Sequence, residues 1–526
     1  MKHIWIIGIV ALLFSSCNSF LKEYSQDLAR VENIGDLDEL LGGDAYYPAG
    51  YVEFGRSSIT LHATPFNHFV HFMSDELKQN DRTDNGRSDA GYYGYFTWQR
   101  QVGINDKETD VAREDGSWNQ VYDYINVTNM ILAELEETEA ENSNEEKAKI
   151  RIEGETHFLR ALYYFTLVNL YAEPYSPEKA STTSGVPVKL TSFVEDKEYV
   201  NASVAEVYAQ ILEDLDRAVE CLGQSERKSL YRADINAAYL LLSRVYLYMQ
   251  DYKNARKYAQ LVIDAKPALF DLKGASNQGN VLDDKNPEVI FSMGGDLLTY
   301  YIYGSDRDDA QNPYYVSDEL AAAFDNPDDL RKTVYLKETD YGYCYQKIYW
   351  GRAHTGAYCR VSDNYLFRTA EAYLNLAEAA AFDNDEAKAR EMLGQLQAKR
   401  FSTAPVISES GEELIRLIQQ ERQRELCLEG HRWYDMRRYT VLPEGKGKWN
   451  RTVSHTYTQF SSDYYDPVPI RTRVFELEPD DKAFTLAFPK EVLDFQSTLG
   501  ANRRPDRKPV FDEELEPDED DDDWDW

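Results

Sequence analysis

The chain has 526 residues and a formal net charge of −35. Its length is sufficient for a large hydrophobic core and, taken alone, predicts two to four domains. Because a nucleic-acid duplex is itself densely negative, this charge argues against nucleic-acid binding.

The N-terminus carries a secretion signal followed by a cysteine. Lys2 and His3 precede an apolar run over residues 4–14, and Ser15-Ser16-Cys17 follows. The run is far shorter than the roughly 20 apolar residues that span a bilayer, so it is typical of a cleaved signal peptide. The small pair before Cys17 resembles a bacterial lipobox, which predicts cleavage after residue 16 and lipid attachment at Cys17. An ordinary signal peptide with an incidental cysteine is the alternative.

Amphipathic helices dominate the next part of the chain. Residues 118–137 and 150–171 have helical periodicity, and the second helix should end before Glu173-Pro174, since proline cannot continue a helix. Ser203, with Glu206 three residues later, forms a capping box that predicts the start of a further helix.

Two later segments predict helix pairs. Residues 236–265 indicate a helix, a turn at 250–252 and a second helix, in which Ala255 and Ala259 supply the small side chains that close helix approach needs. Residues 363–400 repeat the pattern. This layout is similar to tetratricopeptide units, whose period is about 34 residues. We therefore expect a mostly α body rather than a doubly wound α/β enzyme.

An aromatic stretch over residues 341–360 contains Cys344 and Cys359. If Gly351-Arg352 forms a two-residue turn, strand pairing would place the two cysteines opposite each other and permit a disulfide. A turn at Thr355-Gly356 fits the pattern equally well. No cysteine lies in a C-x-x-C pair, so a zinc site is not expected.

A charged helix is predicted over residues 413–439 and contains the run ERQRELCLEGHRWYDMRRY from Glu421 to Tyr439. Glutamate and arginine recur at spacings of three and four, which places charges along one helical face, and Leu426 and Trp433 belong to the apolar side. By itself this pattern is typical of a solvated helix with surface salt bridges and one buried end.

Aromatic residues in predicted loops are the candidate ligand-binding residues. Sugar rings present apolar faces edged with hydroxyl groups, so glycan sites combine flat aromatic rings with polar side chains. The densest group lies in residues 91–100, GYYGYFTWQR, after the polar run 81–85; the alternative is a β-hairpin whose rings pack against the body. The candidates are Asn85, Tyr92, Tyr93, Tyr95, Trp98, Tyr300, Tyr301, Tyr303 and Trp350.

No catalytic signature stands out in the chain. It contains no G-x-S-x-G elbow, no H-E-x-x-H pair, no phosphate-binding glycine loop and no dinucleotide fingerprint. A glycoside hydrolase usually needs two carboxylates about 5 to 10 Å apart, and among 92 acidic residues no pair is marked out. We expect no enzyme activity, no cofactor and no metal.

Four segments, in this order, resemble the signature segments of the SusD/RagB family of outer-membrane lipoproteins. They are HFLRALYYFTLVNLY, YLFRTAEAYLNLAEAAA with a later QLQAKR, ERQRELCLEGHRWYDMRRY, and FTLAFPKEVLDFQSTLGAN. The commonest family version closes on an Asn-Pro-Gly-Tyr-like motif, where this chain has Gly500-Ala501-Asn502.

The resemblance implies one mostly α domain of tetratricopeptide-like helix pairs (a SusD-like α-α superhelix), with loop-rich segments and a few short β-hairpins. We expect a signal peptide over residues 1–16, a lipidated tether over 17–35, the domain over 36–511 and a disordered tail over 512–526. The tail contains eleven acidic residues, which repel one another.

The resemblance also implies a function at the cell surface. A SusD-like protein would bind an oligosaccharide outside the cell and pass it to a SusC-like TonB-dependent transporter, with Trp98 in the family's ligand-binding region. A peptide ligand, a secreted glycoside hydrolase and a tetratricopeptide scaffold without a small ligand are the alternatives.

Overall fold

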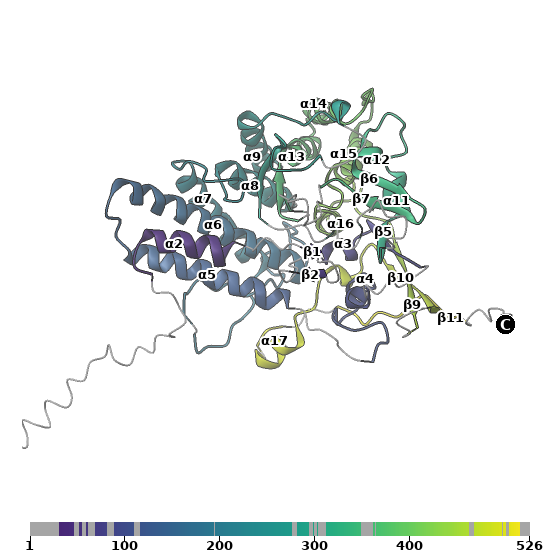
Figure 1. The fold of residues 1–526 in the computed structure, drawn as a ribbon, viewed down its shortest axis with the longest axis horizontal. Coiled ribbons are helices and arrows are strands. Elements are labelled where there is room, and N and C mark those ends of the chain that lie inside the picture. The colour runs from purple at the N-terminus through teal and green to yellow at the C-terminus, as the bar shows by residue number, and fades with distance from the viewer. Residues whose placement is uncertain are drawn as a thin grey trace, which may run out of the picture.

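The fold was obtained as a computed structural model. It describes residues 31–46, 52–54, 59–61, 69–81, 89–109, 116–193, 195–275, 281–293, 298, 302, 312–348, 361–362, 364–461, 468–496, 498–500 and 504–515. Helices predominate in this part of the chain, with several small sheets beside them (Figure 1).

The longer helices make up the helical body of the molecule. They are α5 (Ser117–Glu137), α6 (Ser143–Tyr171), α7 (Val204–Leu222), α8 (Ile235–Tyr248), α9 (Tyr252–Ala265), α13 (Thr369–Phe382), α14 (Glu386–Gln397), α15 (Gly411–Leu426) and α16 (Arg432–Thr440). The shorter ones are α2 (Ile34–Leu40), α3 (Val70–Met73), α4 (Tyr93–Phe96), α11 (Asp318–Ala322), α12 (Arg331–Tyr335) and α17 (Lys490–Phe495).

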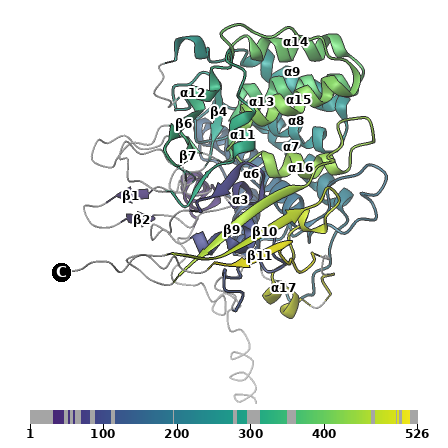
Figure 2. The same cartoon turned by 90° about the vertical axis from the view of Figure 1, so that its right-hand side faces the viewer.

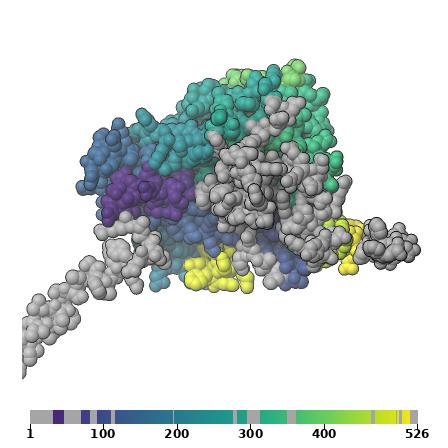
Figure 3. Space-filling view, viewed as in Figure 1, coloured from purple at the N-terminus to yellow at the C-terminus, as the bar shows by residue number. Residues whose placement is uncertain are grey.

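Neighbouring helices pack in pairs, as predicted. Helix α6 contacts α5 and α7, α8 contacts α9, and α13 contacts α9 and α14. Ala255 and Ala259 are fully buried on α9, and the Ser243 hydroxyl of α8 donates to the Ala255 carbonyl at 3.0 Å. In the space-filling view α2 (purple) lies against this helical end of the molecule, while α17 (yellow) lies at the surface (Figure 3).

The helix boundaries follow from local chemistry. Helix α7 begins after Ser203, whose hydroxyl accepts from the backbone N–H of Glu206 while the Glu206 carboxylate accepts from that of Ser203, which confirms the capping box. Helix α6 ends at Tyr171, before Glu173-Pro174. None of the described helices is long and apolar enough to cross a membrane.

In the described part of the chain the strands form four small sheets, which Figure 2 shows from a second direction. The pairs are β1 (Val52–Phe54) with β2 (Ile59–Leu61), and β4 (Val289–Ser292) with β8 (Leu366–Arg368). A four-stranded sheet has the order β3 (Leu77–Gln79), β5 (Tyr314–Val316), β7 (Gly342–Tyr345) and β6 (Leu336–Thr339). A three-stranded sheet has the order β11 (Phe511–Glu514), β10 (Pro469–Leu477) and β9 (Val453–Phe460).

The cysteine hairpin differs from the prediction. Strand β7 pairs with β6, which precedes it, and Cys344 lies opposite Lys337. Cys344 carries a free, buried thiol, which accepts from the Asn312 side-chain amide at 3.3 Å. Burial raises the pKa of this thiol to about 11. Cys359 lies outside the described residues.

The predicted domain ends also shift. Helix α2 begins at Ile34, capped by the Asn33 side chain, within the stretch predicted as tether. Residues 512–514, predicted as the start of the disordered tail, belong to β11, and the Asp512 carboxylate pairs with Arg471 at 2.6 Å. The tail boundary at residue 512 is therefore wrong, because the first acidic residues have a strand partner. Residues 516–526 lie outside the described part.

The single helix predicted over residues 413–439 is two helices. Helix α15 ends at Leu426 and α16 begins at Arg432, with a sharp bend between them. Leu428 and Gly430 have φ angles of 59° and 76°, in the left-handed region. A Cβ on Gly430 would lie 2.5 Å from Oδ1 of Asn364, so the bend needs glycine at this position.

The charged face of α15 is buried, contrary to the solvated helix that its pattern favours. Its glutamates meet cations from distant parts of the chain, and each member of the resulting ionic cluster is at most 2% exposed. The ionic cluster consists of Arg331, Lys347, Arg368 and Arg400 with Glu288, Glu421, Glu425 and Glu429. Asp329, also buried, adds a further carboxylate at the edge of the ionic cluster and pairs with Arg331 at 2.7 Å.

Glu425 is the centre of the ionic cluster. Its carboxylate accepts from Arg368 at 2.6 Å and from Arg400 at 2.8 and 2.9 Å, and it also lies 3.3 Å from Arg331. Burial raises the pKa of Glu425, but the attraction of Arg400 and Arg368 outweighs it, so the pKa lies well below its ordinary value. The carboxylate therefore stays ionised inside the protein.

We predict that Glu425→Gln lowers the free energy of unfolding by about 3 to 5 kcal/mol, because buried guanidinium groups would then lack their counter-charge. Chemical denaturation of the two proteins measures the difference. Lys388→Gln is the control: its partner Glu391 is half exposed, and a surface pair contributes less than about 1 kcal/mol. Equal losses in the two variants would contradict the central role of Glu425.

Candidate functional site

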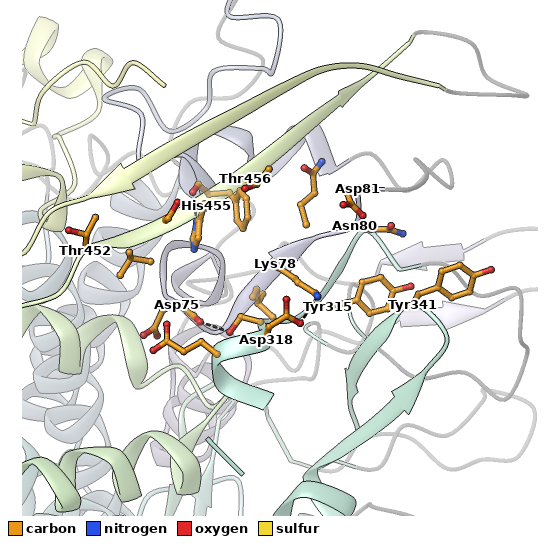
Figure 4. Close-up of a pocket in the computed structure, with 17 residues that line it drawn as sticks. Asp75, Lys78, Asn80, Asp81, Tyr315, Asp318, Tyr341, Thr452, His455 and Thr456 are labelled. Atoms are coloured by element: carbon orange, nitrogen blue, oxygen red, sulfur yellow. Dashed lines mark hydrogen bonds and ion pairs between the residues drawn. The ribbon is translucent and has the colours of Figure 1, made fainter. Parts of the chain in front are cut away.

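A cleft of about 620 Å³ lies where β3, the β5–α11 segment and β9 come together (Figure 4). Strand β3 contacts both β5 and β9, so segments far apart in the chain meet at one place. The exposed or half-buried residues that line it are Lys78, Asp81, Ser317, Asp318, Glu319, Tyr341, Thr452, Ser454 and Thr456.

Strand β9 supplies one wall of the cleft. Its residues alternate, so that Ser454 and Thr456 are exposed while Val453, His455 and Tyr457 are buried. The Gln79 side chain of β3 binds the backbone of Thr458 in both directions, donating to its carbonyl at 2.9 Å and accepting from its N–H at 2.6 Å. These two hydrogen bonds hold β9 beside β3.

The opposite wall carries aromatic and charged side chains. Tyr341 lies at the turn of the β6–β7 hairpin and is half buried. Gly342 has a φ of 149°, and a Cβ there would lie 3.2 Å from the Tyr315 ring, so glycine lets the hairpin pack on that ring. Beside these rings Lys78 pairs with Asp318 at 2.6 Å (Figure 4).

Asp75 anchors the floor of the cleft. Its carboxylate accepts two hydrogen bonds of 2.7 Å from Arg432, at the start of α16, and also pairs with Arg451. Burial raises the pKa of Asp75, but the attraction of Arg432 and Arg451 outweighs it and the net shift is downward. The Asp75 carbonyl accepts from the Ser317 hydroxyl at 2.7 Å, which holds α11 in place.

The bend after α15 positions this floor. The Glu76 carboxylate accepts from the backbone N–H of Leu428 at 3.0 Å. Lys347, two residues after β7, donates to the carbonyl groups of Glu425 and Cys427 at 2.8 and 3.0 Å. The backbone of the bend is therefore hydrogen-bonded to Glu76, just before β3, and to Lys347, just after β7. These two strands belong to two walls of the cleft.

The cleft can form hydrogen bonds with a ligand rich in hydroxyl groups. It exposes carboxylates at Asp81 and Asp318, hydroxyls at Ser454 and Thr456, and the ring of Tyr341. Carboxylates and hydroxyls accept or share hydrogen bonds, and a tyrosine ring offers an apolar face. In the part of the chain described by the structure, no group of three His, Cys, Asp or Glu side chains could hold a metal ion.

The predicted aromatic platform of residues 92–98 is wrong as an exposed surface. Trp98 and Tyr93 are fully buried, and Tyr92 and Tyr95 are 7% and 8% exposed. The segment forms a short 3₁₀ turn (Asp89–Tyr92) and α4 instead of a loop. Gly94 permits this burial, since a Cβ there would lie 2.2 Å from the Val102 carbonyl oxygen.

Two aromatic rings of this segment pack against His455 of β9, which belongs to the cleft wall. Trp98 stacks on His455 at 4.4 Å, and its indole N–H donates to the Met73 carbonyl at 2.9 Å. Phe96 stacks on the other side of His455 at 4.2 Å. Burial lowers the pKa of His455 to about 4 despite the nearby Phe96 carbonyl and Asp75. The aromatic segment therefore packs β9 against β3.

The remaining predicted residues lie outside the described part of the chain. They are Cys17, Asn85, Tyr300, Tyr301, Tyr303 and Trp350. Their assigned roles in lipid attachment and ligand binding stay predictions.

Sequence reasoning missed the cleft residues of β9 and the Tyr341 turn. The alternation in VSHTYTQF marks a strand with one exposed face. Nothing in the sequence places that strand beside β3, because Gln79 and Thr458 are 379 residues apart.

Comparisons with known proteins cover most of the chain. Residues 62–247 match a SusD-like family described as starch-binding and associating with the outer membrane, and residues 275–485 match the SusD family. SusD-like protein P2 of Formosa agariphila is 26% identical over 435 residues, covering 73% of this chain and 82% of that protein.

Solved structures share the fold. A SusD-like carbohydrate-binding protein from Bacteroides vulgatus has a TM-score of 0.66 and 20% identity, covering 89% of this chain and 98% of its own. A laminarin-binding SusD-like protein has a TM-score of 0.57 and 19% identity, covering 89% and 96%. The predicted fold class, mostly α with tetratricopeptide-like helix pairs, is confirmed.

We predict that Trp98→Phe lowers the free energy of unfolding by about 1 kcal/mol and leaves ligand affinity unchanged. The ring would still stack on His455, while the hydrogen bond to Met73 would be lost. Denaturation and ligand titration measure the two effects. Lost affinity with unchanged stability would instead support Trp98 as a ligand platform.

Proposed function

Because the chain belongs to the SusD family, we propose that it is a surface lipoprotein that binds an oligosaccharide and does not cleave it. SusD-like proteins are carbohydrate-binding and associate with the outer membrane. We place the ligand in the cleft beside β3, β5 and β9, and propose delivery to a SusC-like TonB-dependent transporter.

The composition of the cleft is the observation that carries this proposal. A half-buried tyrosine lies at a tight turn across from a strand that exposes hydroxyl side chains, with exposed carboxylates at the rim. Oligosaccharides need such a mixture, because their hydroxyl groups require polar partners and their ring faces require an apolar surface. The laminarin-binding relative supports a glycan as the ligand class.

The membrane anchor is the second part of the proposal. We place the lipid on Cys17 and the protein on the outer face of the outer membrane, where large glycans are accessible. A lipid anchor fits the short apolar run at residues 4–14, which cannot span a bilayer.

Replacing Cys17 with alanine should move the protein from the membrane fraction to the soluble fraction, since the acceptor sulfur is removed. Cell fractionation and mass spectrometry of the mature N-terminus test this outcome. Recovery of the wild-type protein in the soluble fraction without attached lipid would refute the anchor. The glycan cleft is tested separately, by the next experiment.

Tyr341→Ala should weaken oligosaccharide binding by about 1 to 3 kcal/mol, the range measured for nucleobases stacked on aromatic side chains. A glycan array that includes laminarin oligosaccharides identifies the tightest ligand, and calorimetry then compares the variants. Tyr341→Phe keeps the ring and should retain most of the affinity. Tyr231→Ala, at an exposed tyrosine that does not line the cleft, is the control.

Three outcomes would contradict the proposed function. Binding of peptides but no glycans would identify a peptide-binding member of the family. Release of shorter sugars during incubation would identify a hydrolase. Unchanged affinity in Tyr341→Ala would place the ligand outside this cleft.

A further inference from the structure

A second hollow, of about 220 Å³, lies next to the cleft, between α15 and the segment that leads into β9. Glu319 lines both cavities, and Arg451, which lines the second one, pairs with both Glu319 and Asp75. These ion pairs lie between the hollow and Asp75 at the cleft floor. We call this cavity the Trp449 hollow; it is lined by Arg416, Gln419, Gln420, Gln423, Arg432, Lys448, Trp449, Asn450 and Arg451, among others.

Two cations contact the Trp449 ring. The guanidinium groups of Arg432 and Arg451 lie over the indole, at 5.2 and 4.7 Å from the ring centroid. The side chain is 8% exposed, and its N–H has no acceptor among the described residues. Buried N–H groups are rarely left without a partner, and this one belongs to a side chain that lines the hollow, so an acceptor bound there could satisfy it.

The rest of the lining is rich in hydrogen-bond donors. Within the described chain, the side-chain amides of Gln420, Gln423 and Asn450 make no hydrogen bond. Arg416 pairs with Glu412, and Lys448 pairs with Glu444. In each pair the partner is four residues away and the side chains are partly exposed. Surface pairs of this kind are weak and can exchange partners with a ligand.

The two cavities therefore differ in charge. The Trp449 hollow is lined by four cationic side chains and one carboxylate, Glu319. The cleft exposes the carboxylates of Asp81, Asp318 and Glu319 with Lys78 as its only cation among the lining residues. The chain as a whole has a net charge of −35, so a hollow lined mainly by cations differs in sign from the chain's overall charge.

We propose that the Trp449 hollow is a second ligand subsite that binds a carboxylate or sulfate group of a charged oligosaccharide. The inference rests on the proposed function, since the remaining sugar units would lie in the cleft. The Trp449 indole N–H, the free amides and the Arg416 and Lys448 cations would donate to the anionic oxygens.

Calorimetry with three sets of oligosaccharides of equal length tests this subsite. Alginate fragments carry carboxylates, carrageenan fragments carry sulfates, and laminarin fragments are neutral. We expect Trp449→Phe to weaken binding of an anionic set by about tenfold or more, because one charge-assisted hydrogen bond is lost, and to leave laminarin binding unchanged. The anionic set that responds identifies the group.

Two further variants keep the test independent of folding. Trp433→Phe is the matched control, because it also removes a buried indole N–H without an acceptor but does not line the hollow. The double variant R416Q/K448Q changes partly exposed side chains only. It should lower anionic affinity and reduce its dependence on salt concentration.

The failures of the two proposals can be told apart. If no glycan of any kind binds the wild-type protein, the proposed function fails. If glycans bind but Trp449→Phe and R416Q/K448Q match Trp433→Phe for every set, the subsite alone is refuted. Equal losses for neutral and anionic sets would also refute it, since a neutral sugar would then occupy the hollow.

Discussion

The rest of the structure depends on the buried attraction between Glu425 and the guanidinium groups around it. Arg368 ends β8, Arg400 follows α14, and Arg331 begins α12, so one carboxylate joins three separate parts of the chain. Buried ion pairs contribute little net stability compared with apolar packing, but removal of one partner is costly. The cluster therefore fixes which segments meet rather than providing the main driving force, which comes from the apolar core.

The same cluster leads directly to the cleft. Glu429, four residues beyond Glu425, accepts from Arg368 and from Lys347, which follows the β7 wall. The left-handed bend at Leu428 then presents a backbone N–H to Glu76, and α16 starts with the arginine that holds Asp75. The helical body and the cleft are thus connected through the short segment from Glu425 to Arg432. This connection explains why a charged segment can be a signature of a binding protein.

Local patterns predicted the helices well, because caps, proline and periodicity act within a few residues. The capping box at Ser203 and the stop before Pro174 are examples. The burial of the α15 charges could not be predicted. A charged helical face has the same sequence pattern whether it is exposed to water or paired with arginines from distant segments. The same limit applies to Trp98: a ring among glycines and polar residues resembles an exposed platform, but His455, more than 350 residues later, covers it. The cleft itself arises only when β3 and β9 come together.

The central claim is that this chain holds an oligosaccharide in the cleft without breaking it. The most direct measurement is a crystal structure of the protein with its tightest-binding oligosaccharide. We predict sugar density beside Tyr341, with hydrogen bonds to Asp81 and to the exposed hydroxyls of β9, and with every glycosidic bond intact. Density at another surface with the cleft empty, or a cleaved sugar in the cleft, would contradict the account.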